Sequence, residues 1–198
     1  MKLFREAGID GFEYLGIEGS PDVFEYRNKM EFTFGDMEKG GELTLGMHVK
    51  NKSFAICTVD DCKIVDEDFR KVLSTAINYF QDKELPKYRV MQHTGYLRNL
   101  VVRKGINTGE ILVNIVTTTQ LEFDMSDFIK AILAQEYKGA ITGIIHTFND
   151  SLSDVVQADS IEVLHGREFI YEELLGLKFK INPFSFFQTN TRGAEKLY

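Results

Sequence analysis

The sequence from Lys29 to His48 reads KMEFTFGDMEKGGELTLGMH. In each half of this stretch apolar residues alternate with polar ones, and the apolar residues are Met30, Phe32, Phe34, Leu43, Leu45 and Met47. Alternation with a period of two is typical of a β-strand with one buried face. The turn-forming residues Glu38 to Gly41 separate the two halves, so the stretch predicts an antiparallel hairpin. We expect a third short strand from Ser53 to Cys57.

The clearest helix follows this hairpin. One continuous apolar stripe with helical spacing is formed by Phe69, Val72, Leu73, Ala76, Ile77 and Phe80. Asp66 or Asp68 is placed to cap its first turn, and Pro86 closes the segment. A second helix is expected to begin at Ser126 and to bury Phe128, Ile129, Ile132 and Leu133.

Further strands are expected at Tyr88–His93, Leu97–Arg103, Ile111–Thr117, Ile141–Phe148, Ile161–Leu164, Phe169–Glu172 and Leu177–Ile181. Residues 105–109 form a hairpin loop in this interpretation. The order of elements predicts an α+β fold, with a mostly antiparallel sheet and two main helices. We divide the chain into an irregular lead-in (1–25), a central α+β domain (26–181) and a C-terminal segment (182–198).

The last residues predict the start of another helix. Thr189, Asn190 and Thr191 offer capping side chains, and Leu197 continues an apolar face. Because so short a helix is marginal alone, we expect it to lead into a larger architecture, although a terminal helix docked on the core fits the same pattern. Its exposed apolar surface is a candidate dimer contact.

Composition narrows the protein class. The chain has 198 residues, 43% of them hydrophobic and 27% charged, with only two cysteines. These values argue against disordered, collagen-like and disulfide-rich proteins. No apolar run is long enough to span a bilayer, so a cytoplasmic protein without membrane contact is expected. The net charge is −7, yet 85–109 contains no acid and several bases; this predicts either a basic face or an ordinary solvated strand surface.

Local motifs do not complete an active site. The sequence contains no G-x-G-x-x-G, phosphate-binding P-loop, H-E-x-x-H, C-x-x-C or G-x-S-x-G pattern. Its four histidines are isolated from one another. We therefore assign no catalytic residue to this chain.

Five segments in order carry a resemblance to a known family. They are YRNKM at 26–30, LGMH at 45–48, VDDCKI at 59–64, LRNLVVR at 97–103 and NPFSFFQTN at 182–190. Together they resemble the RNA (uracil-C5) methyltransferases, which use S-adenosylmethionine to make 5-methyluridine in ribosomal or transfer RNA. The resemblance implies a central-domain fragment in which 182–198 are the truncated start of the Rossmann-like methyltransferase domain that follows in the family.

The resemblance implies an RNA partner, with ribosomal RNA favoured over transfer RNA, and a chain that is inactive alone. A stand-alone, non-catalytic RNA-binding or interaction module is the alternative. By similarity Gln188 contacts S-adenosylmethionine, although it is also placed to cap the final helix. Phe186 corresponds to an aromatic residue near the flipped uridine, or packs in the core. Arg27 and Lys29 match RNA-facing positions, or lie on a solvated strand.

Cys62 matches the last of four cysteines that hold an iron–sulfur cluster in many family members. The other three would precede Tyr26, and residues 1–24 contain no cysteine. A cluster is therefore not expected in this chain, although the resemblance leaves one possible in a full-length protein. A buried free thiol is the alternative for Cys62, and Cys57 has no counterpart.

Overall fold

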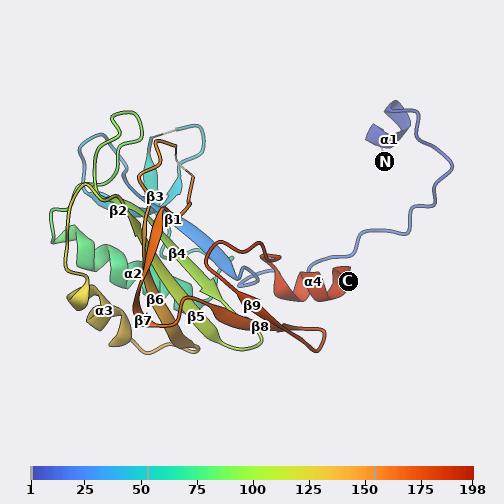
Figure 1. Cartoon of the computed structure of the whole chain (residues 1–198). Coiled ribbons are helices and arrows are strands. Elements are labelled where there is room, and N and C mark those ends of the chain that lie inside the picture. The colour runs from blue at the N-terminus through green and yellow to red at the C-terminus, as the bar shows by residue number, and fades with distance from the viewer. Residues whose placement is uncertain (1, 53, 154) are drawn as a thin grey trace.

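The computed structural model describes residues 2–52, 54–153 and 155–198. Its centre is a seven-stranded sheet of order β3-β2-β1-β4-β5-β6-β7, with two helices packed on one face (Figure 1). The sheet and these helices comprise β1 (Lys29–Asp36), β2 (Leu43–His48), β3 (Ile56–Thr58), β4 (Leu97–Lys104), β5 (Glu110–Thr117), β6 (Ala140–Phe148), β7 (Ser160–Gly166), α2 (Glu67–Gln81) and α3 (Ser126–Leu133).

The hairpin and the first helix form as the sequence predicts. β1 pairs antiparallel with β2, and Phe34 lies opposite Leu45. The alternating residues Met30, Phe32 and Phe34 are buried in one core with the apolar stripe of α2. Asp66 caps α2 by accepting hydrogen bonds from two backbone amides of its first turn. Burial of these apolar surfaces stabilises the sheet and the helix together, because neither covers its own apolar face.

The sheet is mostly antiparallel, as expected, but β5 and β6 are parallel. A parallel pair needs a crossover connection, and the segment containing α3 provides it. Phe128 and Ile132 of α3 are buried, whereas Leu133, the last residue of the helix, is 41% exposed. The prediction that Leu133 is buried is therefore wrong, because this residue at the end of the helix faces solvent.

The expected strand at Tyr88–His93 is wrong. This segment is a loop that folds back on itself: the Arg89 amide donates to Thr94 O at 2.7 Å, and His93 has a positive φ of 55°. The Tyr88 amide donates to Leu97 O of β4 at 2.7 Å, but the amides of Gln92 and His93 donate to Arg89 O within the loop instead of forming a ladder with the sheet. The third strand, expected at Ser53–Cys57, is β3, which spans Ile56–Thr58. Ser53 lies outside the described residues.

A second, smaller layer covers part of the other face of the sheet. It is a two-stranded ribbon of β8 (Ile170–Leu174) and β9 (Leu177–Ile181), and it buries Ile170 and Ile181 against Leu112 and Ile145. The ribbon leads through 182–190 to α4 (Thr191–Leu197). It thereby places the C-terminal segment beside one end of the sheet (Figure 1).

The lead-in runs past α4 and away from the sheet (Figure 1). It contains one short helix, α1 (Lys2–Glu6), so it is not wholly irregular, and α1 has no buried residue. Asp22 pairs with Arg192 of α4, and Glu18 pairs with Lys196.

Among the described residues, no helix is long and apolar enough to cross a membrane.

His146 makes the stability of this fold sensitive to pH. It is 4% exposed on β6, its Nε2 lies 2.7 Å from Thr117 Oγ1, and burial lowers its pKa to about 4. The unfolded chain binds a proton near the ordinary pKa of about 6.5, so the free energy of unfolding falls as the pH drops from about 6.5 toward 4. The difference of about 2.5 units corresponds to about 3 kcal/mol.

We expect His146→Gln to remove most of this pH-dependent loss, as measured by urea unfolding at pH 7.5 and pH 4.5. His165→Gln is the matched control, because His165 is exposed on β7, and it should keep the full loss. A His146→Gln protein that loses as much stability in acid as the unsubstituted chain would contradict this account.

Candidate functional site

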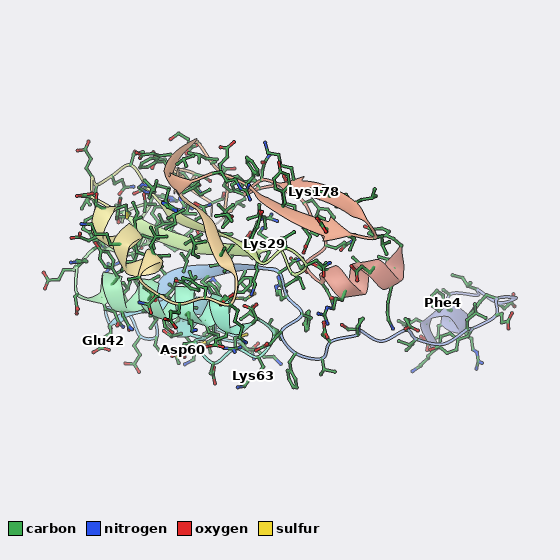
Figure 2. All side chains as sticks on the ribbon, turned by 90° about the horizontal axis from the view of Figure 1, so that it is seen from below. Phe4, Lys29, Glu42, Asp60, Lys63 and Lys178 are labelled. Atoms are coloured by element: carbon green, nitrogen blue, oxygen red, sulfur yellow. The ribbon has the colours of Figure 1, made fainter. Side chains whose placement is uncertain are left out.

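The segment 182–190, here called the motif segment, connects β9 to α4 and lies against the N-terminal end of β1. Arg27 forms an isolated antiparallel bridge with Asn190, and the Asn28 amide donates to Thr189 O at 2.9 Å. Figure 2 shows the side chains in this region, with Lys29 of β1 and Lys178 of β9 labelled. Residues separated by about 160 positions in the sequence therefore meet at one end of the sheet.

Asn28 fixes the end of the motif segment that leads into α4. Its side-chain amide donates to Gln188 O at 2.8 Å and to Thr191 Oγ1 at 2.9 Å. The side chain is buried, so both hydrogen bonds replace water that it cannot reach. The Asn28 carbonyl in turn accepts from the backbone amide of Lys104, which joins this contact to β4.

Glu172 of β8 continues the same network. Its side chain is fully buried and accepts hydrogen bonds from Ile106 N at 2.6 Å, Asn107 N at 3.0 Å and Thr191 Oγ1 at 3.0 Å. A buried carboxylate is tolerated only when such donors replace its water. Glu172 therefore links the β8–β9 ribbon, the β4–β5 loop and the first residue of α4.

Arg103 fixes the other end of the motif segment. Its Nε donates to Pro183 O at 2.9 Å, and one of its terminal nitrogens donates to Ser185 O at 2.5 Å. Burial lowers the pKa of Arg103 to about 10, partly opposed by the charge of Glu31. The guanidinium therefore stays protonated near neutral pH, and its charge strengthens both hydrogen bonds.

Several bases expected on a basic face are instead buried. Arg103 and Arg98 donate to backbone carbonyl oxygens, and Lys104 pairs with Asp66 and Asp68. Their exposed fractions are 4%, 3% and 8% respectively. Three of the bases in 85–109 therefore bind internal groups of the fold. The absence of acids from this stretch did not predict that, because the partners lie elsewhere in the sequence.

The structure removes one alternative for each of two motif-segment residues, and their RNA and cofactor roles stay predictions. Phe186 is 87% exposed, so the core-packing alternative is wrong; the neighbouring Phe187 packs instead, with its ring 5.6 Å from that of Phe179. Gln188 does not cap α4, because Asn190 does so by accepting from Gly193 N at 2.8 Å. The Gln188 amide lies 3.5 Å from the Tyr198 hydroxyl.

Lys29, the first residue of β1, and Arg27, two residues before it, lie beside the motif segment. Arg27 Nε donates to Lys29 O at 2.9 Å, and the Lys29 ammonium pairs with Glu31. The Lys29 side chain is 25% exposed. Lys29 lies opposite Arg103 in the β1–β4 pairing, so its side chain shares the sheet face against which the motif segment is held.

Cys62 lies in the connection between β3 and α2, half-buried against the main core and next to the chain that enters β1. The amides of Glu25 and Arg27 donate to Lys63 O and Ile64 O, and the Cys62 carbonyl accepts from Arg70. Cys57 and Cys62 are both free thiols. Among the described residues no cluster of three or more potential metal ligands is formed. These donors do not fit an iron–sulfur cluster, which needs about four thiolates.

The chain resembles RNA methyltransferases throughout its length. It is 61% identical over 198 residues to an uncharacterized RNA methyltransferase of Clostridium tetani, matching 100% of this chain and 43% of that protein. A tRNA (uracil(54)-C(5))-methyltransferase of Pyrococcus furiosus is 32% identical over 178 residues, which is 90% of this chain and 39% of that protein. No model of a protein family matches the chain.

A solved structure shows the same fold. The tRNA (uracil-54, C5)-methyltransferase of Pyrococcus abyssi, in complex with S-adenosyl-L-homocysteine, matches with a TM-score of 0.70 and 27% identity, covering 90% of this chain and 41% of that one. This chain is homologous over its full length to a part of the RNA methyltransferases. The resemblance noted in the sequence is thereby confirmed. The chain spans less than half the length of the RNA methyltransferases named here.

Sequence reasoning missed the residues that hold the motif segment. Asn28 lies inside one of the five resembling segments, but no role was assigned to it, and Glu172 was counted only as the end of a strand. The sequence held a signal for both residues. Asn28 stands beside the first strand and Glu172 lies among apolar strand residues, and a polar side chain buried in such a place needs a hydrogen-bond partner. Their partners lie far away in the sequence and could not be paired from it.

We expect Asn28→Ala to loosen the motif segment without unfolding the sheet. Loss of the two side-chain hydrogen bonds should cost about 1–3 kcal/mol and speed hydrogen exchange at the amides of Gly193 and Ala194. Asn78→Ala on the exposed side of α2 is the matched control and should leave exchange there unchanged. Equal exchange in 182–194 for both variants would show that Asn28 does not hold this segment.

Proposed function

We propose that this chain is the central, RNA-contacting part of an S-adenosylmethionine-dependent RNA (uracil-C5) methyltransferase, acting in the cytoplasm to form 5-methyluridine, with ribosomal RNA as the favoured substrate. One observation carries the proposal: an aromatic residue, Phe186, projects from a segment whose backbone is held at both ends, beside Arg27 and Lys29. The relatives named for uracil-54 of tRNA support the uracil-C5 assignment.

The chemistry explains why such a segment is useful. Uracil C5 is a weak nucleophile, so a thiolate adds first to C6 and a base later removes the C5 proton. S-adenosylmethionine supplies the methyl group. We assign neither Cys57 nor Cys62 to the thiolate role and place the nucleophile and base outside these 198 residues. Gln188 offers one amide, which can donate and accept, as a single cofactor contact.

The target uridine must leave its stack to react, at a cost of a few kcal/mol. An exposed aromatic ring offsets this cost, because stacking of a base on it contributes about 1–3 kcal/mol. Phe186 is held in a suitable position, since Ser185 and Gln188 on either side of it have bound carbonyls. Arg27 and Lys29 would contact the phosphates beside that base.

RNA binding by the chain tests this assignment. We expect Arg27→Gln and Lys29→Gln to weaken binding of a single-stranded, uridine-containing oligonucleotide and to reduce the salt slope by about 0.7 each. Phe186→Ala should weaken binding by about tenfold, equivalent to about 1.4 kcal/mol of lost stacking, without changing the slope. Fluorescence anisotropy at several salt concentrations measures both. Lys130→Gln on α3 is the control; equal losses for it would indicate non-specific binding.

Methyl transfer tests the catalytic part separately. With labelled S-adenosylmethionine and transcripts of ribosomal and transfer RNA, we expect the 198-residue chain to give background incorporation. Expressed within its complete reading frame, the protein should methylate uracil C5, with ribosomal RNA favoured. The alternative, a stand-alone binding module, predicts RNA binding but no methylation in either form. Turnover by the 198 residues alone would overturn the expected inactivity.

The same proposal includes self-association through α4. Leu197 and Tyr198 are 70% and 74% exposed, so their apolar surface is accessible to a second copy. Whether the chain dimerises is measured by light scattering.

A further inference from the structure

A cavity of about 480 Å³ lies at the end of β1 opposite the motif segment. It is enclosed by the last residues of β1, by β2 and β3, and by the loop that replaces the expected strand at Tyr88–His93. Its lining includes Thr33, Phe54, Ile56, Tyr88, Met91 and Arg98. The volume lies within the range of about 300–1,000 Å³ that is usual for small-molecule and cofactor sites.

Apolar side chains at this cavity are exposed in the chain as it stands. Met91 is 86% exposed and Phe54 is 64% exposed, although both are large and apolar. Single exposed apolar residues are common, but these two share one concave wall with the buried residue Ile56. A flat, partly apolar group such as a nucleobase would cover them.

The same cavity is positively charged. Among the described lining residues, Lys39, Lys87, Arg89 and Arg98 are basic and Asp36 is the one acid, which pairs with Lys87. Within the described part of the chain, Lys39 and Arg89 have no ion-pair partner. The lining therefore has an excess of positive charge suited to an anion.

Arg98 brings one of these charges below the surface. It is 3% exposed and stacks over the Tyr88 ring with its guanidinium carbon 4.1 Å from the ring centroid. Its terminal nitrogens donate to the carbonyls of Asn149, Ser151 and Ser153, whereas its Nε has no acceptor among the described residues. A buried donor without an acceptor is rare, and this one belongs to a residue of the cavity wall.

The cavity and the motif segment share one face of the sheet. Alternate residues of a strand point to the same face, so Thr33 and Gly35, which line the cavity, lie on the same face as Lys29. The distance along β1 from Lys29 to Gly35 is about 20 Å. This face is opposite to the one that α2 covers, because Phe32 and Phe34 pack toward α2.

We propose that this cavity binds one nucleotide of the same RNA strand whose target base lies at the motif segment. The base would lie against Phe54 and Met91, and Lys39 and Arg89 would contact its phosphate. The inference rests on the proposed function for the presence of RNA, but it concerns a second site at the far end of β1. Contacts with one strand at both the cavity and the motif segment would fix the strand's register and leave the target base free to be extruded.

Photo-crosslinking of a 4-thiouridine-containing single-stranded oligonucleotide tests where RNA lies on the chain. We expect crosslinked peptides to include Phe54 or Met91 as well as the motif segment. Uridine monophosphate at the oligonucleotide's concentration should leave the cavity crosslinks unchanged. Loss of those crosslinks under this competition would identify a free-nucleotide site and overturn the proposal.

The double variant Lys39→Gln/Arg89→Gln tests the charges. Removing both contacts to this one phosphate should weaken oligonucleotide binding about fivefold near 0.1 M salt and reduce the salt slope by about 0.7. The matched control is Lys83→Gln/Lys130→Gln on the helix side, where Lys83 lies over Tyr79 and Lys130 pairs with Asp127. The control should stay within about twofold of the unsubstituted chain.

The outcomes separate this inference from the proposed function. If the cavity variant binds like the unsubstituted chain while Lys29→Gln and Phe186→Ala lose affinity, the cavity proposal is wrong and the motif-segment assignment stands. If only the cavity variant loses affinity, the cavity binds RNA, but the motif-segment assignment is wrong and so is the inference that one strand occupies both sites. An oligonucleotide that crosslinks to neither site would overturn both.

Discussion

The fully buried carboxylate of Glu172 is the constraint on which the arrangement of the C-terminal half depends. Moving an ionised carboxylate out of water costs several kcal/mol unless other donors replace the water. Here the donors are Ile106 N, Asn107 N, Thr191 Oγ1 and the adjacent Glu173 N. Three of them come from the β4–β5 loop and from α4, so the full set forms only when the ribbon, the loop and the helix meet. The cost of burial therefore makes their relative placement specific.

This constraint passes to the motif segment through shared atoms. Thr191 Oγ1 donates to Glu172 and accepts from Asn28, and Asn28 also binds the Gln188 carbonyl. Arg103 binds the carbonyls at the other end of the segment. The protein therefore uses the segment's carbonyl groups for anchoring and leaves the Phe186 ring free. The stacking proposed for Phe186 would gain from such a rigid backbone, because less ordering remains to be done on binding.

Local patterns predicted most of the elements but not the contacts between distant ones. The periods of two and 3.6 were enough for β1, β2 and α2, because each pattern is complete within a few residues. The loop at Tyr88–His93 was misassigned because its alternation is compatible with both a strand and a folded-back turn. For the site, similarity of motifs indicated Phe186 and Gln188, whereas Arg103 was counted only among the bases of 85–109 and as the end of a strand. Its true partners lie about 80 residues away, and only the fold brings them together.

The two faces of the sheet have different physical tasks. The face under α2 and α3 buries large apolar side chains and supplies the hydrophobic stability of the domain. The opposite face holds buried polar groups, among them Asn99, Asn114 and Thr147, which stabilise less per unit area but fix position through directional hydrogen bonds. β1 contributes to both faces, because its residues alternate between them. A rigid strand that is anchored in the core on one side can hold two surface sites at a constant separation on the other.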